Sequence, residues 1–277
     1  MIKALVLLIP VVWLSACSSF LYYPTQDLYT KPDSFPHPPT EVTFFSDDTF
    51  KLIAWHFKHK SPAKATLIVF HGNGQNISSH IMSSYWLFDE GYDIFIFDYP
   101  GYGGSTGPLN PKTTVMAGLK AIEYVKAQSP DQSIAILGQS LGGAVAMKTL
   151  IQLNDRSNIC HLALESTFDS YQKVAQKVLA KTWITWPFQY LSYLLLSDAF
   201  APGDDIKNIS SIPITLFHRK NDPIVPYIFA NRILSKAEEP QRLHTLPGQG
   251  HIDAFTSFDR SENRKTLLSH LKPCLNR

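Results

Sequence analysis

Charged residues are scarce in this chain of 277 residues. Asp, Glu, Lys and Arg make up 17% of the sequence, the formal net charge is +2, and no run of five or more like charges occurs. Proteins that bind nucleic acid carry a basic patch or stripe, so no nucleic-acid partner is expected. Hydrophobic residues, at 44%, are in contrast sufficient for a substantial core. Folds of mixed helices and strands often form one unit at this length.

Cysteine is also scarce. Cys17, Cys160 and Cys274 are the three cysteines, and none lies in a CxxC or zinc-type spacing, so no metal site is expected. Cys160 should begin a core strand and Cys274 should follow the last helix, which puts both at the same edge of the sheet described below. A disulfide between them would persist in an exported protein. Two unrelated thiols are the alternative.

The apolar run at the N-terminus is too short to span a bilayer comfortably, but it has the layout of a secretory signal. The run Leu14-Ser15-Ala16-Cys17 resembles the bacterial lipobox, in which the cysteine is lipidated and becomes the mature N-terminus. We therefore interpret residues 1–16 as a signal peptide and Cys17 as a lipidation site. An ordinary cleaved signal with an incidental cysteine is the alternative. The lipobox resemblance implies a membrane-anchored lipoprotein of the bacterial cell envelope, and Ser18 indicates the periplasmic side of the outer membrane.

Proline-rich residues 17–40 predict an extended tether. The remaining residues, 41–277, alternate β-branched or aromatic runs with helical patterns, which predicts a mainly parallel sheet with helices on both faces. The first two strands should form an antiparallel hairpin. Strands are expected at Glu41–Ser46, Phe50–Phe57, Thr66–Phe70, Asp93–Phe97, Ser133–Leu137, Cys160–Leu164, Ile212–Phe217 and Arg242–Leu246. Helices are expected over residues 76–89, from Pro111 onward and over Leu141–Leu153.

Residues 166–212 break this alternation. The segment is rich in aromatic residues, Trp183 and Trp186 among them, and has no strand-like stretch followed by a crossover. An insertion of this kind between two core strands predicts a short helical cap over a site. An ordinary crossover packed on the sheet is the alternative.

The sequence Gly138-Gln139-Ser140-Leu141-Gly142 is a GxSxG motif between a predicted strand and a predicted helix. This is the context of a nucleophile elbow, in which the serine sits on a strained turn. Glycines on both sides relieve the crowding, and the N-terminus of the helix favours developing negative charge. The pattern indicates Ser140 as a nucleophile.

A serine hydroxyl needs a base, and the base needs an acid to orient it. Asp222 and His251 each follow one of the last two predicted strands, in the order Ser, acid, His that this type of fold uses. Glu165, also at a strand end, is the alternative acid. His71 and His218 are alternative histidines at strand ends, but His71 precedes the nucleophile, and His218 is better placed to brace the loop of Asp222. Asp253 is too near His251 in sequence to orient it easily.

The tetrahedral intermediate of acyl transfer needs two backbone donors. The amide of Leu141 follows the nucleophile and should be one of them. The second is expected from the loop His71-Gly72-Asn73-Gly74, whose small residues let the backbone approach a substrate. We assign it to the amide of Asn73; a plain tight turn is the alternative.

Five motifs occur in an order that resembles the Bem46-like family of α/β hydrolases. They are His71-Gly72-Asn73-Gly74, Phe97-Asp98-Tyr99-Pro100-Gly101-Tyr102-Gly103, Gly138-Gln139-Ser140-Leu141-Gly142-Gly143, Asp222-Pro223-Ile224-Val225-Pro226 and Gly250-His251. The match covers roughly residues 40–271. It implies an α/β-hydrolase fold with an eight-stranded sheet whose second strand is antiparallel, and a Ser-Asp-His triad. One departure is Arg219, where relatives usually carry glycine.

The function expected from these residues is hydrolysis of a carboxylic ester or thioester through an acyl-enzyme, without a metal or organic cofactor. The partners implied are a small acyl ester, lipid-like in view of the aromatic cap, and a membrane reached through the lipid anchor. A peptidase or amidase uses the same triad, and a non-catalytic envelope lipoprotein could keep the fold for binding. The sequence does not indicate an oligomeric state.

Overall fold

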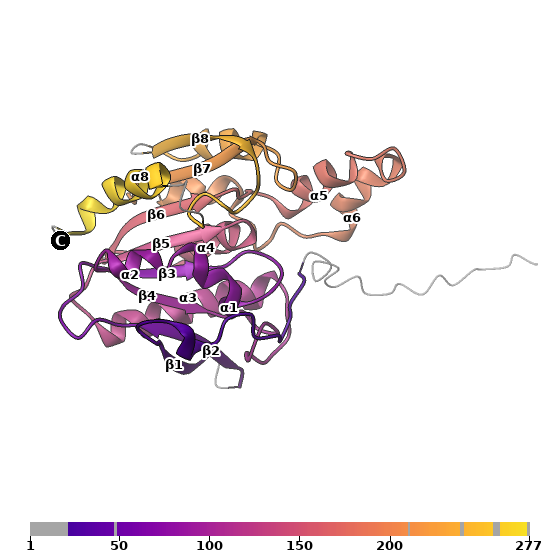
Figure 1. Cartoon of the computed structure of the whole chain (residues 1–277). Helices are drawn as coiled ribbons and strands as arrows, with labels where there is room; N and C mark the ends of the chain where they lie inside the picture. The colour runs from indigo at the N-terminus through magenta and orange to yellow at the C-terminus, as the bar shows by residue number, and fades with distance from the viewer. Residues whose placement is uncertain (1–21, 47–48, 210, 239–240, 257–260, 276–277) are drawn as a thin grey trace, which may run out of the picture.

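A computed structural model of the chain describes residues 22–46, 49–209, 211–238, 241–256 and 261–275 (Figure 1). The predicted signal peptide and the predicted lipidation site Cys17 lie outside these residues. One sheet of eight strands runs through the molecule in the order β1-β2-β4-β3-β5-β6-β7-β8. The strands are β1 (Thr40–Phe45), β2 (Lys51–Phe57), β3 (Thr66–Phe70), β4 (Asp93–Phe97), β5 (Ile134–Gln139), β6 (Ile159–Glu165), β7 (Ile214–Asn221) and β8 (Gln241–Gln249).

The strand directions confirm the fold class predicted from the sequence. β2 runs antiparallel to both of its neighbours, β1 and β4. The other five strand pairs are all parallel: β4 with β3, β3 with β5, β5 with β6, β6 with β7, and β7 with β8. Carboxyl ends of parallel strands meet at one edge of a sheet, so the loops that follow β3, β5, β7 and β8 converge there.

Helices cover both faces of the sheet, and neighbouring residues of the central strands enter different cores. On β3, Ile68 and Phe70 pack into one core, whereas Leu67 and Val69 pack into the other. The first core is covered by α3 (Pro111–Gln128), α4 (Leu141–Gln152) and α7 (Ile228–Leu234), and the second by α2 (Trp86–Asp89) and α8 (Ser261–Leu271). Burial of both strand faces explains the continuous apolar runs in the sequence.

Residues 76–89 do not form the single helix that the sequence predicts. They form α1 (Ile77–His80), a short 3-10 turn and α2 (Trp86–Asp89). At the break the hydroxyl of Ser83 donates to the carbonyl oxygen of His80 at 2.8 Å. Serine hydroxyls that bond to nearby backbone groups compete with regular helix formation, and the apolar spacing does not reveal this competition.

The last two strands run further toward the site than predicted. β7 continues past Phe217 to Asn221, and β8 continues past Leu246 to Gln249. The two strands stay paired over most of this extension, with a shift of register before Asn221. Residues that the sequence places in loops are therefore held in the sheet, and Asp222 follows β7 directly.

The described part of the predicted tether lies against the domain. Tyr22 and Phe35 are buried, and Pro24 forms a parallel bridge with Gln75. The aromatic side chains between the prolines supply apolar surface that a solvated linker lacks. Tyr22 and Phe35 therefore anchor the segment on the domain, whereas Tyr23, Leu28 and Tyr29 are exposed.

The insertion between β6 and β7 is helical and stands off the carboxyl end of the sheet (Figure 1). We call residues 171–195 the cap; they contain α5 (Tyr171–Leu179), a 3-10 helix (Trp186–Leu191) and α6 (Ser192–Leu195). Asp198 ties the base of the cap together, because its carboxylate accepts from the hydroxyl of Ser170 at 2.5 Å and from the amide of Gln172 at 3.1 Å. None of the helices in the described ranges is long and apolar enough to cross a membrane.

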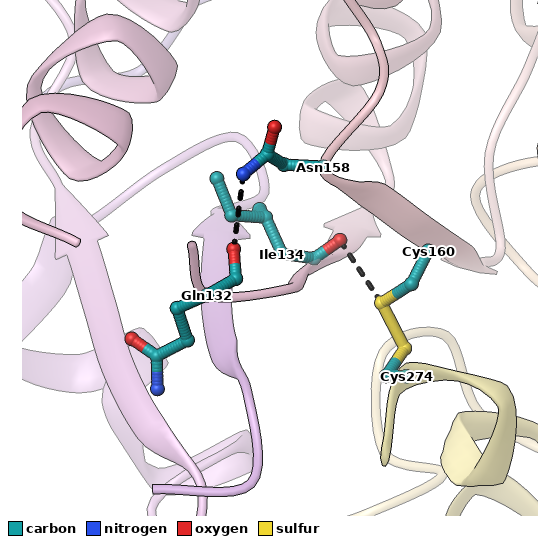
Figure 2. The surroundings of a disulfide bond; sticks show 5 residues. All are labelled: Gln132, Ile134, Asn158, Cys160 and Cys274. Atoms are coloured by element: carbon teal, nitrogen blue, oxygen red, sulfur yellow. Dashed lines mark hydrogen bonds between the residues drawn. A yellow bond between two sulfur atoms is a disulfide. The ribbon is translucent and has the colours of Figure 1, made fainter. Parts of the chain in front are cut away.

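A disulfide joins Cys160, near the start of β6, to Cys274, beyond α8 (Figure 2). The Cα atoms of the two residues are 5.2 Å apart, and both side chains belong to the core that α8 covers. The bond therefore fastens the C-terminal helix to the edge of the sheet opposite the converging loops.

We expect the Cys274→Ser variant to lose about 2–5 kcal/mol of unfolding free energy, because the bond closes a long loop in the unfolded chain. The two cysteines are 114 residues apart in sequence. Chemical denaturation under oxidising conditions measures the loss. Dithiothreitol should bring the wild-type protein to the value of the variant and leave the variant unchanged. Equal stability of both proteins without reductant would show that the bond contributes nothing.

Candidate active site

Ser140 occupies a sharp turn between β5 and α4. Its backbone is strained, with φ of 52° and ψ of −119°, a region that residues other than glycine rarely adopt. Glycine is required on both sides of this turn. A Cβ atom on Gly138 would lie 2.6 Å from the Cα atom of Gly143, and one on Gly142 would lie 2.1 Å from the carbonyl oxygen of Phe70. The turn therefore has the geometry of a nucleophile elbow.

Ser140, His251 and Asp222 meet at the carboxyl end of the sheet. The Oγ atom of Ser140 lies 2.8 Å from Nε2 of His251, and Nδ1 of His251 lies 2.8 Å from Oδ2 of Asp222. The three side chains come from the segments that follow β5, β8 and β7. The structure thus brings together the three residues that the sequence selected, in one hydrogen-bonded series.

Asp222 is held in its charged form. Its side chain is buried, and Oδ1 accepts from the amides of Ile224 and Val225 at 2.8 Å each. Burial acts to raise the pKa of Asp222, but the hydrogen bond with His251 and the two amides keep this pKa below its ordinary value. A charged Asp222 fixes the imidazole so that Nε2 faces the serine.

Glu165, the alternative acid, is bonded to other groups. Its carboxylate accepts from the side-chain amide of Gln139 at 2.6 Å and from the backbone amide of Ala254 at 2.7 Å. Burial raises the pKa of Glu165 to about 7 against the effect of these bonds. Glu165 therefore links the residue before Ser140 to the chain just after His251, and Asp222 is the carboxylate at the imidazole.

The two other histidines at strand ends have structural partners. Nε2 of His218 donates to the carbonyl oxygen of Val225 at 2.9 Å, which braces the loop of Asp222. The ring of His71 stacks on Tyr99 with the ring centroids 4.2 Å apart. Burial lowers the pKa of both histidines. Within the described residues, no group of three or more His, Cys, Asp and Glu side chains is placed to hold a metal ion.

Arg219 braces the loop that carries His251, a contribution that the sequence did not reveal. Its side chain is buried; Nε donates to Oδ1 of Asp253 at 2.9 Å, and the guanidinium also donates to the carbonyl oxygen of Pro247. Both acceptors belong to the segment around His251. Gly250 makes room for this arrangement, because a Cβ atom there would lie 2.8 Å from Nε of Arg219. Arg219, where relatives usually carry glycine, therefore fits beside the loop of Asp222.

A cavity of about 510 Å³ opens beside Ser140. Leu141 and Asn73, the predicted oxyanion donors, line it together with Ser140. Leu141 is the first residue of α4, where the helix N-terminus favours negative charge. The Oδ1 atom of Asn73 accepts from the amide of Tyr23 at 2.8 Å and from the hydroxyl of Tyr102 at 2.9 Å. These bonds fix the loop of Asn73 and place Tyr23 in the cavity wall.

The walls of this cavity are apolar and come largely from the cap. None of the described side chains that line it is charged. The cap contributes, among others, Val178, Leu179, Phe188, Leu191 and Leu195. An apolar cavity with a few polar groups at one end orients a ligand by those groups and holds its apolar part by burial.

Known proteins resemble this chain in sequence over most of its length. The family described as alpha/beta hydrolase fold matches residues 65–179. The protein YfhR of Escherichia coli K12 is 32% identical over 264 residues, which cover 93% of this chain and 88% of that protein. The chain belongs to the α/β-hydrolase superfamily. This confirms the resemblance inferred from the five motifs, and the protein is a hydrolase of that superfamily.

Two further comparisons bear on the superfamily. The lysophosphatidylserine lipase ABHD12 of Xenopus tropicalis is 27% identical over 210 residues, which cover 73% of this chain and 54% of that protein. Among solved structures, an esterase of Pyrococcus furiosus has a TM-score of 0.73 at 18% identity, covering 92% of this chain and 98% of that one. An esterase of Exiguobacterium antarcticum has a TM-score of 0.62 at 19% identity, with coverages of 84% and 100%. At these identities the solved structures show a common fold.

Proposed function

We propose that this protein is a serine hydrolase that cleaves carboxylic esters or thioesters through Ser140, His251 and Asp222. The observation that carries the proposal is the pair of 2.8 Å contacts that connects Asp222 through His251 to Ser140. This series ends at a cavity that can hold an acyl group beside the serine oxygen. The esterase fold of the solved relatives supports the same reaction class.

The proposed reaction has two halves. His251 takes the proton of Ser140 while the serine oxygen attacks the acyl carbonyl carbon, and the amides of Leu141 and Asn73 donate to the resulting oxyanion. The intermediate collapses when the bond to the leaving oxygen or sulfur breaks, and His251 gives its proton to that group. Water, activated by His251, then attacks the acyl-enzyme and releases the acid.

The lining of the cavity favours an ester with an apolar acyl chain over a peptide or an amino-acid amide. A peptide substrate would bring polar and charged groups into a space whose described lining residues include no charged side chain to receive them. A panel of p-nitrophenyl esters of increasing chain length, compared with aminoacyl amides, tests this choice. We expect turnover of the esters that rises with chain length. Faster turnover of the amides would assign the protein to the peptidases or amidases.

We also propose that Cys17 is lipidated and anchors the enzyme to the periplasmic side of the outer membrane of a bacterial cell. The run Leu14-Ser15-Ala16-Cys17 supports this, since it resembles a lipobox. A single acyl chain binds membranes only weakly, so stable anchoring needs several chains or a second contact with the membrane.

We expect the Cys17→Ser variant to lose palmitate incorporation and to leave the membrane fraction of lysed cells. The reason is that serine has no thiol to accept the lipid. Metabolic labelling with palmitate and fractionation of the lysate measure both effects. The Cys274→Ser variant is the matched control and should stay in the membrane fraction. Unchanged labelling of Cys17→Ser would refute the anchor.

A further inference from the structure

The cap carries a large exposed apolar face. Trp183, Ile184 and Leu194 are 85%, 62% and 69% exposed. Trp186 and Tyr190 are also well exposed, and all of these side chains lie in residues 183–194. Soluble proteins rarely leave a concentrated apolar surface of this kind uncovered unless it binds something.

This face is continuous with the cavity beside Ser140. Phe188, Leu191 and Leu195 are more than a third exposed, and they also line the cavity. An acyl chain could therefore move from the outer surface of the cap to Ser140 along apolar side chains. A lipid surface, which can supply acyl chains to the cavity, therefore fits this face better than a protein partner that would only bury it.

The charge of the cap indicates the chemistry of the partner. Between Asp169 and Asp198 the chain contains no acidic residue but three lysines, Lys173, Lys177 and Lys181. A segment that combines lysines with exposed tryptophan and leucine is typical of proteins that lie on anionic lipid surfaces. A second copy of this chain would instead bring like charges together across a symmetric interface, which opposes association.

The N-terminal segment reaches the same part of the molecule. Tyr23 lines the cavity and is held by Asn73. Cys17 precedes Tyr22 by five residues in the sequence, a length that spans at most roughly 18 Å. A lipid on Cys17 would therefore keep the cavity and the cap close to the membrane.

We propose that the exposed face of the cap, centred on Trp183, Ile184 and Leu194, docks on a bilayer surface with anionic headgroups. The acyl chain of a bilayer lipid then enters the cavity without crossing water. The inference rests on the proposed ester hydrolysis and narrows its substrate to ester lipids taken from a membrane.

Tryptophan quenching by brominated lipids tests the contact directly. The protein that begins at Cys17, which lacks Trp13 of the predicted signal peptide, is mixed with vesicles of equal parts phosphatidylcholine and phosphatidylglycerol that carry brominated acyl chains. The variant Trp183→Phe/Trp186→Phe keeps the aromatic surface but removes the two tryptophans that should contact the lipid. We therefore expect the fraction of tryptophan fluorescence that the brominated lipid quenches to be at least about twofold smaller than in the wild type. Equal quenching in both proteins would overturn the docking of the cap.

Hydrolysis of a vesicle-borne lipid ester tests the consequence. Trp183→Ser/Ile184→Ser/Leu194→Ser changes three side chains that do not line the cavity. We expect its rate on vesicles to fall at least ~10-fold, because the variant loses apolar surface that partitions into the bilayer. Its turnover of monomeric p-nitrophenyl butyrate should match the wild type. The variant Phe45→Ser, at an exposed aromatic residue of β1, is the matched control and should retain both activities.

The outcomes separate the two proposals. If the triple variant hydrolyses the vesicle-borne lipid at the wild-type rate, the cap does not dock on the bilayer. The same holds if the wild-type protein is a dimer, the triple variant is a monomer, and the two hydrolyse vesicle-borne lipid equally fast, because the exposed face then binds a second copy of the chain. Failure of the wild-type protein to hydrolyse p-nitrophenyl butyrate counts against the proposed function instead, and the quenching measurement then decides docking independently of catalysis.

Discussion

Replacement of Ser140 by alanine should lower the turnover of a p-nitrophenyl ester at least ~10³-fold. The substitution removes the Oγ atom that lies 2.8 Å from Nε2 of His251. It leaves the cavity and the amides of Leu141 and Asn73 in place, so residual activity above the uncatalysed rate is expected from binding and oxyanion stabilisation. Alanine keeps the Cβ atom at the strained turn, and the fold should be retained.

A matched serine variant controls for effects on the fold. Ser235 follows α7 and is exposed, and its hydroxyl donates to the carbonyl oxygen of Arg232 in the same helix at 2.9 Å. Ser235→Ala should turn over the ester at the wild-type rate. Similar turnover rates for Ser140→Ala and Ser235→Ala would show that Ser140 is not the nucleophile.

Asp222→Asn should lower turnover roughly 10³–10⁴-fold at neutral pH. The hydrogen bonds that keep the pKa of Asp222 low also keep it charged, and this charge both orients His251 and stabilises the imidazolium that forms during attack. An asparagine amide presents no negative charge and can hold the ring in the wrong tautomer. Steady-state kinetics of the purified variant measure the loss.

Glu165→Gln is the matched carboxylate variant. Glu165 lies at the neighbouring strand end, but it accepts from Gln139 and Ala254. Burial raises the pKa of Glu165 to about 7, so its environment disfavours the charged form, and glutamine keeps the shape of the side chain without the charge. We expect a loss below ~10-fold, the size of one altered hydrogen bond. A larger loss in Glu165→Gln than in Asp222→Asn would make Glu165 the acid.

The central strands were the most predictable part of the fold. β3 and β4 run over the residues that the sequence predicted, Thr66–Phe70 and Asp93–Phe97, because each is an uninterrupted apolar run that the sheet buries on both faces. The chain over residues 76–89 was not predictable in the same way. Its apolar spacing fits a helix, but the hydroxyl bond of Ser83 to the carbonyl oxygen of His80 competes with one.

The residues of the site likewise fall into those that the sequence predicts and those that it does not. Ser140, Asp222 and His251 could be selected from the sequence because each follows a strand, and parallel strands bring such positions to one edge. The contributions of Arg219 and Tyr23 depend on partners far along the chain. Arg219 is buried because Asp253 and Pro247 receive its donors, and Tyr23 lines the cavity because Asn73 holds its amide. The residues next to Arg219 and Tyr23 in the sequence do not indicate which distant groups these two residues will contact.

Labelling with a fluorophosphonate tests the central claim most directly, because the reagent reacts much faster with a serine that a neighbouring base has activated than with an ordinary serine. The labelled protein is digested, and the modified peptide is identified by mass spectrometry. We predict modification of Ser140, strongly reduced labelling in His251→Ala and none in Ser140→Ala. A label on a different residue, or undiminished labelling of Ser140→Ala, would contradict the assignment of Ser140 as the nucleophile.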